Sequence, residues 1–333
     1  MLQDTARSLS PLERTSSSVS SQTKASSCSN ITEDSTCCSQ TSGGSPAQEK
    51  GRRQHGQSPG PLSAGGSSSG FTSRKRNIPN LQDRIPPYPF PADFQLPFGQ
   101  DERVNVISQL CDSPGGPSTI ALLLPGVHGG VGPCREPGSN FDENCLYAMV
   151  AQRLQELGRA VDVYRCSWQF MCPTMTYSLN AVCHVLQHAL KQAQRRGSHA
   201  INVVIVGHSL GGQVALHSAA MLARLKEESH LFLEKGESSM EVTGFCTLNA
   251  AADLKRWEAS EELKRVLSPL KALLVSGDAD EVVPPVCTRE LHEALRCANK
   301  RHLDLPGGTH DLFQYKDFLV DAVSQFIIEC SPA

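Results

Sequence analysis

One serine stands at the end of an apolar run whose residues favour a β-strand. The run Ile201–Val206 is followed by Gly-His-Ser-Leu-Gly at residues 207–211, and then by an Ala/Leu-rich stretch from Gln213 to about Lys226 that predicts a helix. Glycines at 207 and 211 remove side chains that would clash where the chain reverses, so the Ser209 hydroxyl can stand at the tip of a strained turn. This strand–turn–helix context predicts a nucleophile, the alternative being an ordinary connection between a strand and a helix.

A serine hydroxyl is a weak nucleophile at neutral pH, so the prediction requires a base and an acid that orients the base. Both are found downstream. The segment 271–285 reads as a buried strand that breaks at Gly277 into an acidic turn, and the segment 301–310 reads as a strand that breaks at a Gly-Gly pair and then carries His310. The chain order is therefore serine, acid, histidine.

From about residue 103 to the C-terminus the chain resembles an α/β-hydrolase, in particular the dienelactone-hydrolase and serine-aminopeptidase-like branches with little or no lid. In these proteins the acid turn reads Gly-x-x-Asp-x-x-Val-Pro, which the residues from Gly277 to Pro284 match with Asp280 as the acid. The competing carboxylate is Asp278, whose alternative role is to form the turn by bonding its own backbone. His310 matches the general base of the family, the alternative being a loop histidine without a task.

The same resemblance implies an oxyanion hole built from two backbone amides. One belongs to the residue after the nucleophile, Leu210, and the other to the loop after the strand at 119–124. Val127 is the preferred second donor because the glycine before it lets the chain turn over the sheet, and Gly130 is the alternative register. Other interpretations of this glycine cluster are a flexible loop or a phosphate cradle, but the Lys-Ser/Thr ending of a phosphate loop is missing.

Composition divides the chain into three parts. About nineteen of residues 1–70 are serine and aromatic residues are almost absent, so we expect residues 1–80 to be a disordered tail, whose partner the sequence does not identify. Residues 81–102 mix proline with aromatic residues and are expected to be a strap or linker whose rings pack on the domain, with a polyproline-type ligand as the alternative. Residues 103–333 form the expected catalytic domain.

Alternating strands and helices in this domain predict an α/β fold, namely an α/β-hydrolase fold with a mostly parallel central sheet, helices on both faces and a minimal lid. The expected strands lie at 103–110, 119–124, 161–166, 201–206, 243–248, 271–275 and 301–305, and the expected helices at 141–157, 177–194, 213–226, 254–267, 286–297 and 312–329.

Charge and cysteine content narrow the partners and the compartment. The net charge of −3 gives no basic footprint for nucleic acid, and no apolar run approaches the length of a membrane span. Thirteen cysteines without a recognisable signal peptide favour reduced thiols and an intracellular, cytoplasmic location. His184 and His188 share one helix face without a third ligand, so we expect an exposed face, no metal and no cofactor.

Only about twenty-two residues separate Leu248 from Lys271, which leaves room for one helix and its connections. This spacing predicts an open site that accepts a small or medium ester, thioester or amide as its acyl substrate, and the loop 130–140 is a candidate to close part of it. We expect hydrolysis through an acyl-enzyme on Ser209. The alternatives are transfer of the acyl group to an acceptor other than water and a non-catalytic binding protein on the same fold.

Overall fold

The computed structural model describes residues 92–98, 101–127, 129–130, 132–134, 144–169, 173–227, 239–250 and 261–332. The predicted tail at 1–80 and the first part of the predicted strap lie outside the described residues, as does most of the loop 130–140.

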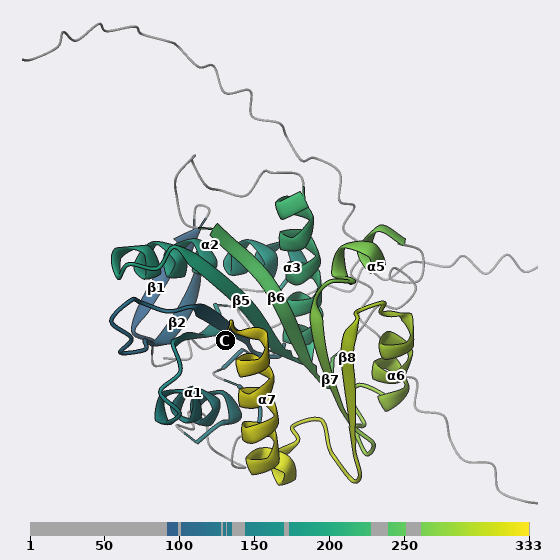
Figure 1. Cartoon of the computed structure of the whole chain (residues 1–333). Coiled ribbons are helices and arrows are strands. Elements are labelled where there is room, and N and C mark those ends of the chain that lie inside the picture. Colours follow the sequence, from purple (N-terminus) through teal and green to yellow (C-terminus); the bar gives the residue numbers. More distant parts are fainter. Residues whose placement is uncertain are drawn as a thin grey trace, which may run out of the picture. The chain divides into compact units, whose positions relative to one another are not determined.

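A single eight-stranded sheet runs through the described chain in the order β1-β2-β4-β3-β5-β6-β7-β8 (Figure 1). β1 and β2 pair antiparallel, β2 is antiparallel to β4, and every other pairing is parallel. The strands are β1 (Phe94–Phe98), β2 (Glu102–Gln109), β3 (Thr119–Leu124), β4 (Val161–Trp168), β5 (Ala200–His208), β6 (Ser239–Leu248), β7 (Lys271–Gly277) and β8 (Asn299–Leu305).

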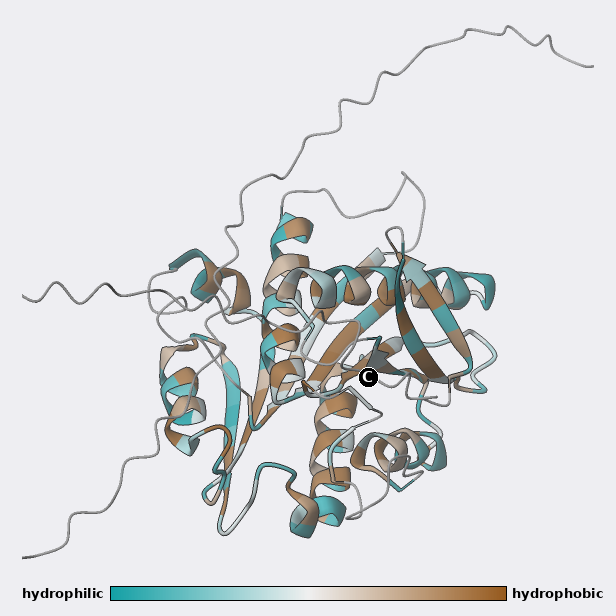
Figure 2. Ribbon diagram, turned by 180° about the vertical axis from the view of Figure 1, so that it is seen from behind, coloured by the Kyte–Doolittle hydropathy of each residue, from teal (hydrophilic) through white to brown (hydrophobic). Residues whose placement is uncertain are grey.

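The centre of the sheet is apolar on both faces. Every residue of β3 is buried, as are the last six residues of β5, because helices cover both sides of these parallel strands. β8 lies at one edge and alternates exposed and half-buried residues instead. Figure 2 shows the contrast, with the inner strands mainly brown and the outer helix faces teal.

Two layers of helices enclose the sheet. α1 (Leu146–Glu156) and α7 (Lys316–Cys330) share one hydrophobic cluster with the sheet, and α2 (Met175–Arg195), α3 (Leu210–Glu227), α5 (Glu261–Leu267) and α6 (Pro285–Ala294) contribute to the cluster on the opposite face. A short 3-10 turn, η2 (Phe313–Tyr315), leads into α7. The predicted mostly parallel sheet with helices on both faces is therefore confirmed.

The sheet starts before the boundary predicted at residue 103. β1 lies within the segment expected to be a strap or linker, 81–102, and it pairs with β2 along its whole length. Phe98 is 4% exposed, and its ring centroid lies 5.1 Å from that of Tyr177 on α2. This part of the segment is a strand because β1 is at the edge of the sheet, where Pro97 needs no partner for a missing N–H.

The histidine pair on α2 contacts β1. The ring of His184 stacks on Phe98 at 5.4 Å between centroids, and the ring of His188 lies 4.6 Å from that of Phe94. The predicted exposed face therefore holds for His184, whereas His188 is half-buried. In the described part of the chain, no three His, Cys, Asp or Glu residues are grouped so as to hold a metal ion.

Several helix limits differ from the predicted ones. α6 ends at Ala294 rather than near Cys297. Between β6 and β7, α5 is described from Glu261 onward, and the predicted start near residue 254 lies outside the described residues. None of the helices described here is both long enough and apolar enough to cross a membrane.

Candidate active site

Ser209 occupies a sharp turn between β5 and α3. Its backbone φ is 54°, in the left-handed region where a residue with a side chain costs about 1 kcal/mol or more. The turn closes because two glycines meet: a Cβ on Gly207 would lie 1.9 Å from the carbonyl oxygen of Gly211. The serine amide donates to the Leu248 carbonyl of β6 at 2.8 Å, which fixes the turn to the neighbouring strand. The local geometry is that of a nucleophile elbow.

Asp280 and His310 form a hydrogen-bonded pair. Asp280 follows β7 and His310 follows β8. Both residues therefore lie beyond the carboxyl ends of parallel strands, as Ser209 does after β5. The distance from His310 Nδ1 to Asp280 Oδ2 is 2.8 Å. The carboxylate is completely buried, whereas the imidazole is 22% exposed. With its proton on Nδ1 facing the carboxylate, the ring leaves Nε2 free to accept a proton.

Donors around Asp280 favour its charged form. Burial raises the pKa of this carboxyl, but the hydrogen bonds from His310 and from the amides of Val283 and Val282 outweigh burial and hold the pKa below its ordinary value. Both amides donate to Oδ1, at 2.8 Å from Val282 and 2.9 Å from Val283, which leaves Oδ2 for the imidazole. The acid is thus both ionised and held in one orientation.

Asp278, the competing carboxylate, bonds a backbone amide, whereas the His310 imidazole bonds Asp280. The Asp278 side chain is exposed, and its Oδ1 accepts from the amide of Gly307 in the loop that leads to the histidine. The structure therefore brings Asp280 to His310 and leaves Asp278 as a link between the two loops.

Two residues that the sequence analysis missed hold the backbone of His310. Asn249, the residue after β6, donates from Nδ2 to the carbonyls of Thr309 at 3.0 Å and His310 at 2.9 Å, and its Oδ1 accepts from the Gly277 amide at 2.8 Å. His208, next to the serine, bonds the His310 carbonyl through Nε2 at 2.8 Å. Neither role has a local signal in the sequence, since each depends on contacts between distant strands.

His310 contacts the residue that precedes the serine. The ring centroids of His208 and His310 lie 4.9 Å apart. The described contacts of the Ser209 hydroxyl include no hydrogen bond to the His310 imidazole. Catalytic hydrogen bonds are often long without substrate and shorten in the complex.

The loop after β3, where the sequence analysis expects the second oxyanion donor, lies beside the serine turn. A Cβ on Gly126 would lie 3.3 Å from that of Ser209, so this loop passes directly beside the elbow. Gly130, the alternative donor, is engaged elsewhere, because its amide donates to the buried Ser167 hydroxyl at 3.1 Å. The Val127 amide has no acceptor among the described residues, and Leu210 is the first residue of α3, whose amide has none within the helix.

The loop 130–140 is described only at 129–130 and 132–134, so its predicted role in closing the site lies outside the described residues. Cys134 joins the described part to the histidine loop. Its amide donates to the Asp311 carbonyl at 3.1 Å, and its thiol to the Leu312 carbonyl at 3.4 Å.

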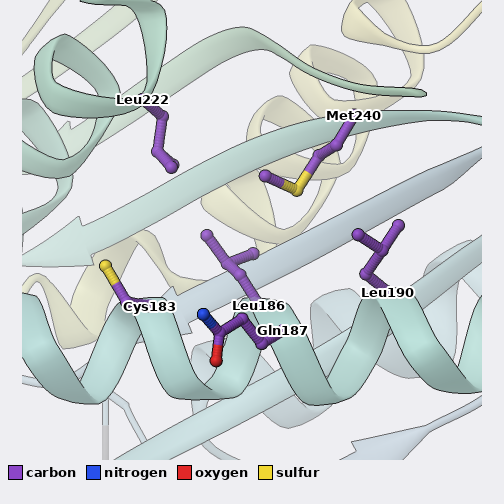
Figure 3. Close-up of a pocket in the computed structure, with 6 residues that line it drawn as sticks. All are labelled: Cys183, Leu186, Gln187, Leu190, Leu222 and Met240. Atoms are coloured by element: carbon purple, nitrogen blue, oxygen red, sulfur yellow. The ribbon is translucent and has the colours of Figure 1, made fainter. Parts of the chain in front are cut away.

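A small apolar pocket lies away from this site (Figure 3). It lies near the beginning of β6, whereas Ser209, Asp280 and His310 follow the carboxyl ends of their strands. The lining residues come from α2, α3 and β6: Cys183, Leu186, Gln187, Leu190, Leu222 and Met240. No titratable group of the site reaches it.

Known proteins resemble this chain in sequence or in fold. The family "Lipase (class 3)" matches residues 147–247, which include the elbow. A protein of Saccharomyces cerevisiae described as "Uncharacterized membrane protein YNL320W" is 27% identical over 130 residues, or 38% of this chain and 46% of that protein. The match therefore spans less than half of the yeast relative.

Solved structures resemble the fold at low sequence identity. Est1E from Butyrivibrio proteoclasticus is 16% identical with a TM-score of 0.49, over 71% of this chain and 98% of that one. XC6422 from Xanthomonas campestris, described as a serine hydrolase without lid, is 17% identical with a TM-score of 0.46, over 74% of this chain and 99% of that one. The sheet order, the antiparallel β2 and the elbow after β5 are those of the α/β-hydrolase fold, which this chain has.

Proposed function

We propose that this α/β-hydrolase-fold chain is a serine hydrolase that cleaves a carboxylic ester, thioester or amide through an acyl-enzyme. The observation that carries the proposal is the buried Asp280 bonded to His310 at 2.8 Å, beside a serine held at a left-handed φ of 54°. A strained serine next to an oriented imidazole has no evident structural benefit, because the strain reduces stability. Residues with strained backbone conformations are concentrated at active sites, where the strain is part of the mechanism.

In the first step, His310 Nε2 accepts the hydroxyl proton of Ser209 while Oγ bonds to the carbonyl carbon of the substrate. Negative charge then develops on the carbonyl oxygen, and the amides of Val127 and Leu210 donate to it. The tetrahedral intermediate collapses, the bond to the leaving group breaks, and that group takes the proton from His310. Asp280 keeps the imidazole in the productive tautomer and stabilises its cation.

In the second step, water loses a proton to His310 and attacks the acyl carbon. The bond to Ser209 breaks, the serine regains its proton, and a carboxylic acid is released. The whole cycle uses side chains and amides of this chain, so we propose hydrolysis without a cofactor.

We base the substrate class on the connection between β6 and β7, which has about twenty-two residues and in whose described part α5 is the one helix. A connection this short leaves little chain to build a cap over the serine, so we propose an open site for a small or medium acyl substrate. Hydrolysis rates for p-nitrophenyl esters of increasing chain length test this, and a steady rise beyond eight acyl carbons would contradict it.

Covalent labelling tests the proposed nucleophile. A fluorophosphonate probe should label the parent chain and leave Ser209→Ala unlabelled, because alanine fits the turn but supplies no oxygen. Ser276→Ala is the matched control: this serine lies near the end of β7, is 1% exposed and is bonded to His302 and Asp304. Equal labelling of the parent and of Ser209→Ala would refute the proposal. Product analysis with added alcohols or amines separates hydrolysis from acyl transfer.

A further inference from the structure

The peptide group between Gly126 and Val127 is held through its carbonyl oxygen. The indole Nε1 of Trp168 donates to the Gly126 oxygen at 3.1 Å, and the Gly129 amide donates to the same oxygen at 3.0 Å. Two donors on one carbonyl leave the plane of this peptide little freedom to rotate.

The direction of that carbonyl fixes the direction of the Val127 amide. The peptide is trans, so its N–H points away from its C=O. Gly126 lies close beside the elbow, since a Cβ added to it would lie only 3.3 Å from atoms of both Ser209 and His208. Holding the Gly126 oxygen on Trp168 therefore aims the Val127 amide at the side of the peptide that Trp168 does not occupy.

Trp168 is itself rigid. It is the last residue of β4, is 1% exposed and pairs with Val104 of β2. The edge of its ring contacts Tyr177, with centroids 6.3 Å apart at 79°. The indole N–H of a buried tryptophan usually needs a hydrogen-bond acceptor, and here the acceptor is the Gly126 carbonyl, in the loop beside the serine turn.

We infer that Trp168 is a positioning residue for the oxyanion hole, acting through the Gly126–Val127 peptide. The inference rests on the proposed function. Hydrogen bonds to a carbonyl also polarise its amide, so the Val127 N–H becomes a better donor while its direction is fixed. The benefit arises only when charge forms on the substrate oxygen, so it lowers the barrier to reaction without strengthening binding of the substrate.

The test removes the indole N–H donor of Trp168, first with a ring system of nearly the same shape and then with a smaller ring. In the full chain, Trp168 is replaced by 3-benzothienylalanine, in which sulfur takes the place of the N–H, and separately by Trp168→Phe. We expect kcat to fall about tenfold, less than the roughly 10²- to 10³-fold loss when an oxyanion donor is deleted. KM and the pH profile of kcat should stay unchanged, and the inhibition constant of a trifluoromethyl ketone should rise by the same factor as kcat falls.

Tyr177→Phe is the matched control. The Tyr177 hydroxyl donates to the Arg103 carbonyl and accepts from the Gln169 amide at 3.0 Å, so the change removes a hydroxyl beside Trp168 and keeps the indole N–H. It should leave kcat unchanged. An equal fall in kcat for Tyr177→Phe, or parent kcat in the benzothienyl variant, would overturn the inference while leaving the hydrolase proposal intact. A parent chain without ester hydrolysis and without labelling at Ser209 would refute the proposed function and this inference together.

Discussion

At the residue scale, Asp280 is distinguished from Asp278 by what points at each carboxylate. The first receives an imidazole and two amides in a buried turn, and the second receives one amide in an exposed loop. Asp280→Asn should lower kcat on the order of 10⁴-fold, because an amide bonds the histidine in the wrong tautomer. Asp278→Asn is the control, with a loss expected below about tenfold. Steady-state ester hydrolysis measures both, and a larger loss for Asp278→Asn would move the acid to that residue.

Asn249 also acts at this scale, through three hydrogen bonds of one buried side chain. Asn249→Ala leaves the Gly277 amide without this acceptor, at a cost on the order of 1–3 kcal/mol for a buried donor left unpaired, and leaves the His310 carbonyl bonded to His208 alone. It also places alanine at a φ of 45°, which asparagine tolerates better. We expect both the free energy of unfolding in urea and kcat to fall.

Thr247→Val is the control for Asn249→Ala. Thr247 is equally buried on β6, but its hydroxyl has no hydrogen-bond partner among the described residues, so its loss should leave stability unchanged or raised. If Asn249→Ala is as stable and as active as Thr247→Val, Asn249 does not hold the histidine loop.

At the element scale, α6 follows the acid turn and contacts the edge strand β8 through a pair of histidine side chains. The rings of His292 on α6 and His302 on β8 lie 5.6 Å apart at 30°. Burial is the main cause that lowers the pKa of each; Lys300 and the partner ring add to it for His292, and Arg289 adds to it for His302. Glu293 and Asp304 oppose these shifts, and Ser276 bonds His302 at 2.9 Å.

This pair predicts loss of stability in mild acid. Both folded pKa values lie below the ordinary 6.5, so the unfolded chain binds protons more readily. The contribution of the neutral rings is therefore complete above pH 6.5 and is lost as the pH falls towards the folded values. Urea unfolding between pH 7.5 and 5 should show a smaller loss for His302→Gln than for the parent. His199→Gln, at an exposed position, is the control, and the same slope in all three chains would contradict the prediction.

Elements and site residues differ in how far the sequence predicts them. Ser209, Asp280 and His310 follow short strands at recognisable glycine turns, so each has a signal within ten residues of itself. Asn249, His208 and Trp168 have no such signal, because their partners lie on other strands and only the sheet order brings them together. The segment that contains β1 predicts a strap, because its aromatic residues stand next to a domain that can bury them, but its prolines hide the strand pairing that an edge strand allows.

At the scale of the whole molecule, the strands that deliver the three site residues lie in the middle and at one side of the sheet, and β1 closes the opposite edge. Removal of residues 1–80 should leave kcat and the melting temperature unchanged, because every residue with a proposed role lies beyond residue 125. Removal of residues 1–100 should instead lower the melting temperature, because it deletes a strand that pairs with β2 along five residues and covers the rings of Tyr177 and His184.

Phe98→Ala in the chain lacking residues 1–80 measures how much of the stability that β1 contributes comes from the Phe98 ring. Deleting a buried phenylalanine costs about 3–5 kcal/mol, and each kcal/mol lowers the melting temperature of a domain this size by roughly 2–4 °C. Gln95→Ala, at an exposed position of the same strand, should change it little, because its contacts with Asn105 and Arg103 lie at the surface. Thermal unfolding compares the melting temperatures of the two truncated chains and of the Phe98→Ala and Gln95→Ala variants. Equal melting temperatures after removal of 80 and of 100 residues would mean that β1 adds nothing to the stability of the domain, and the sheet that positions the site would then begin at β2.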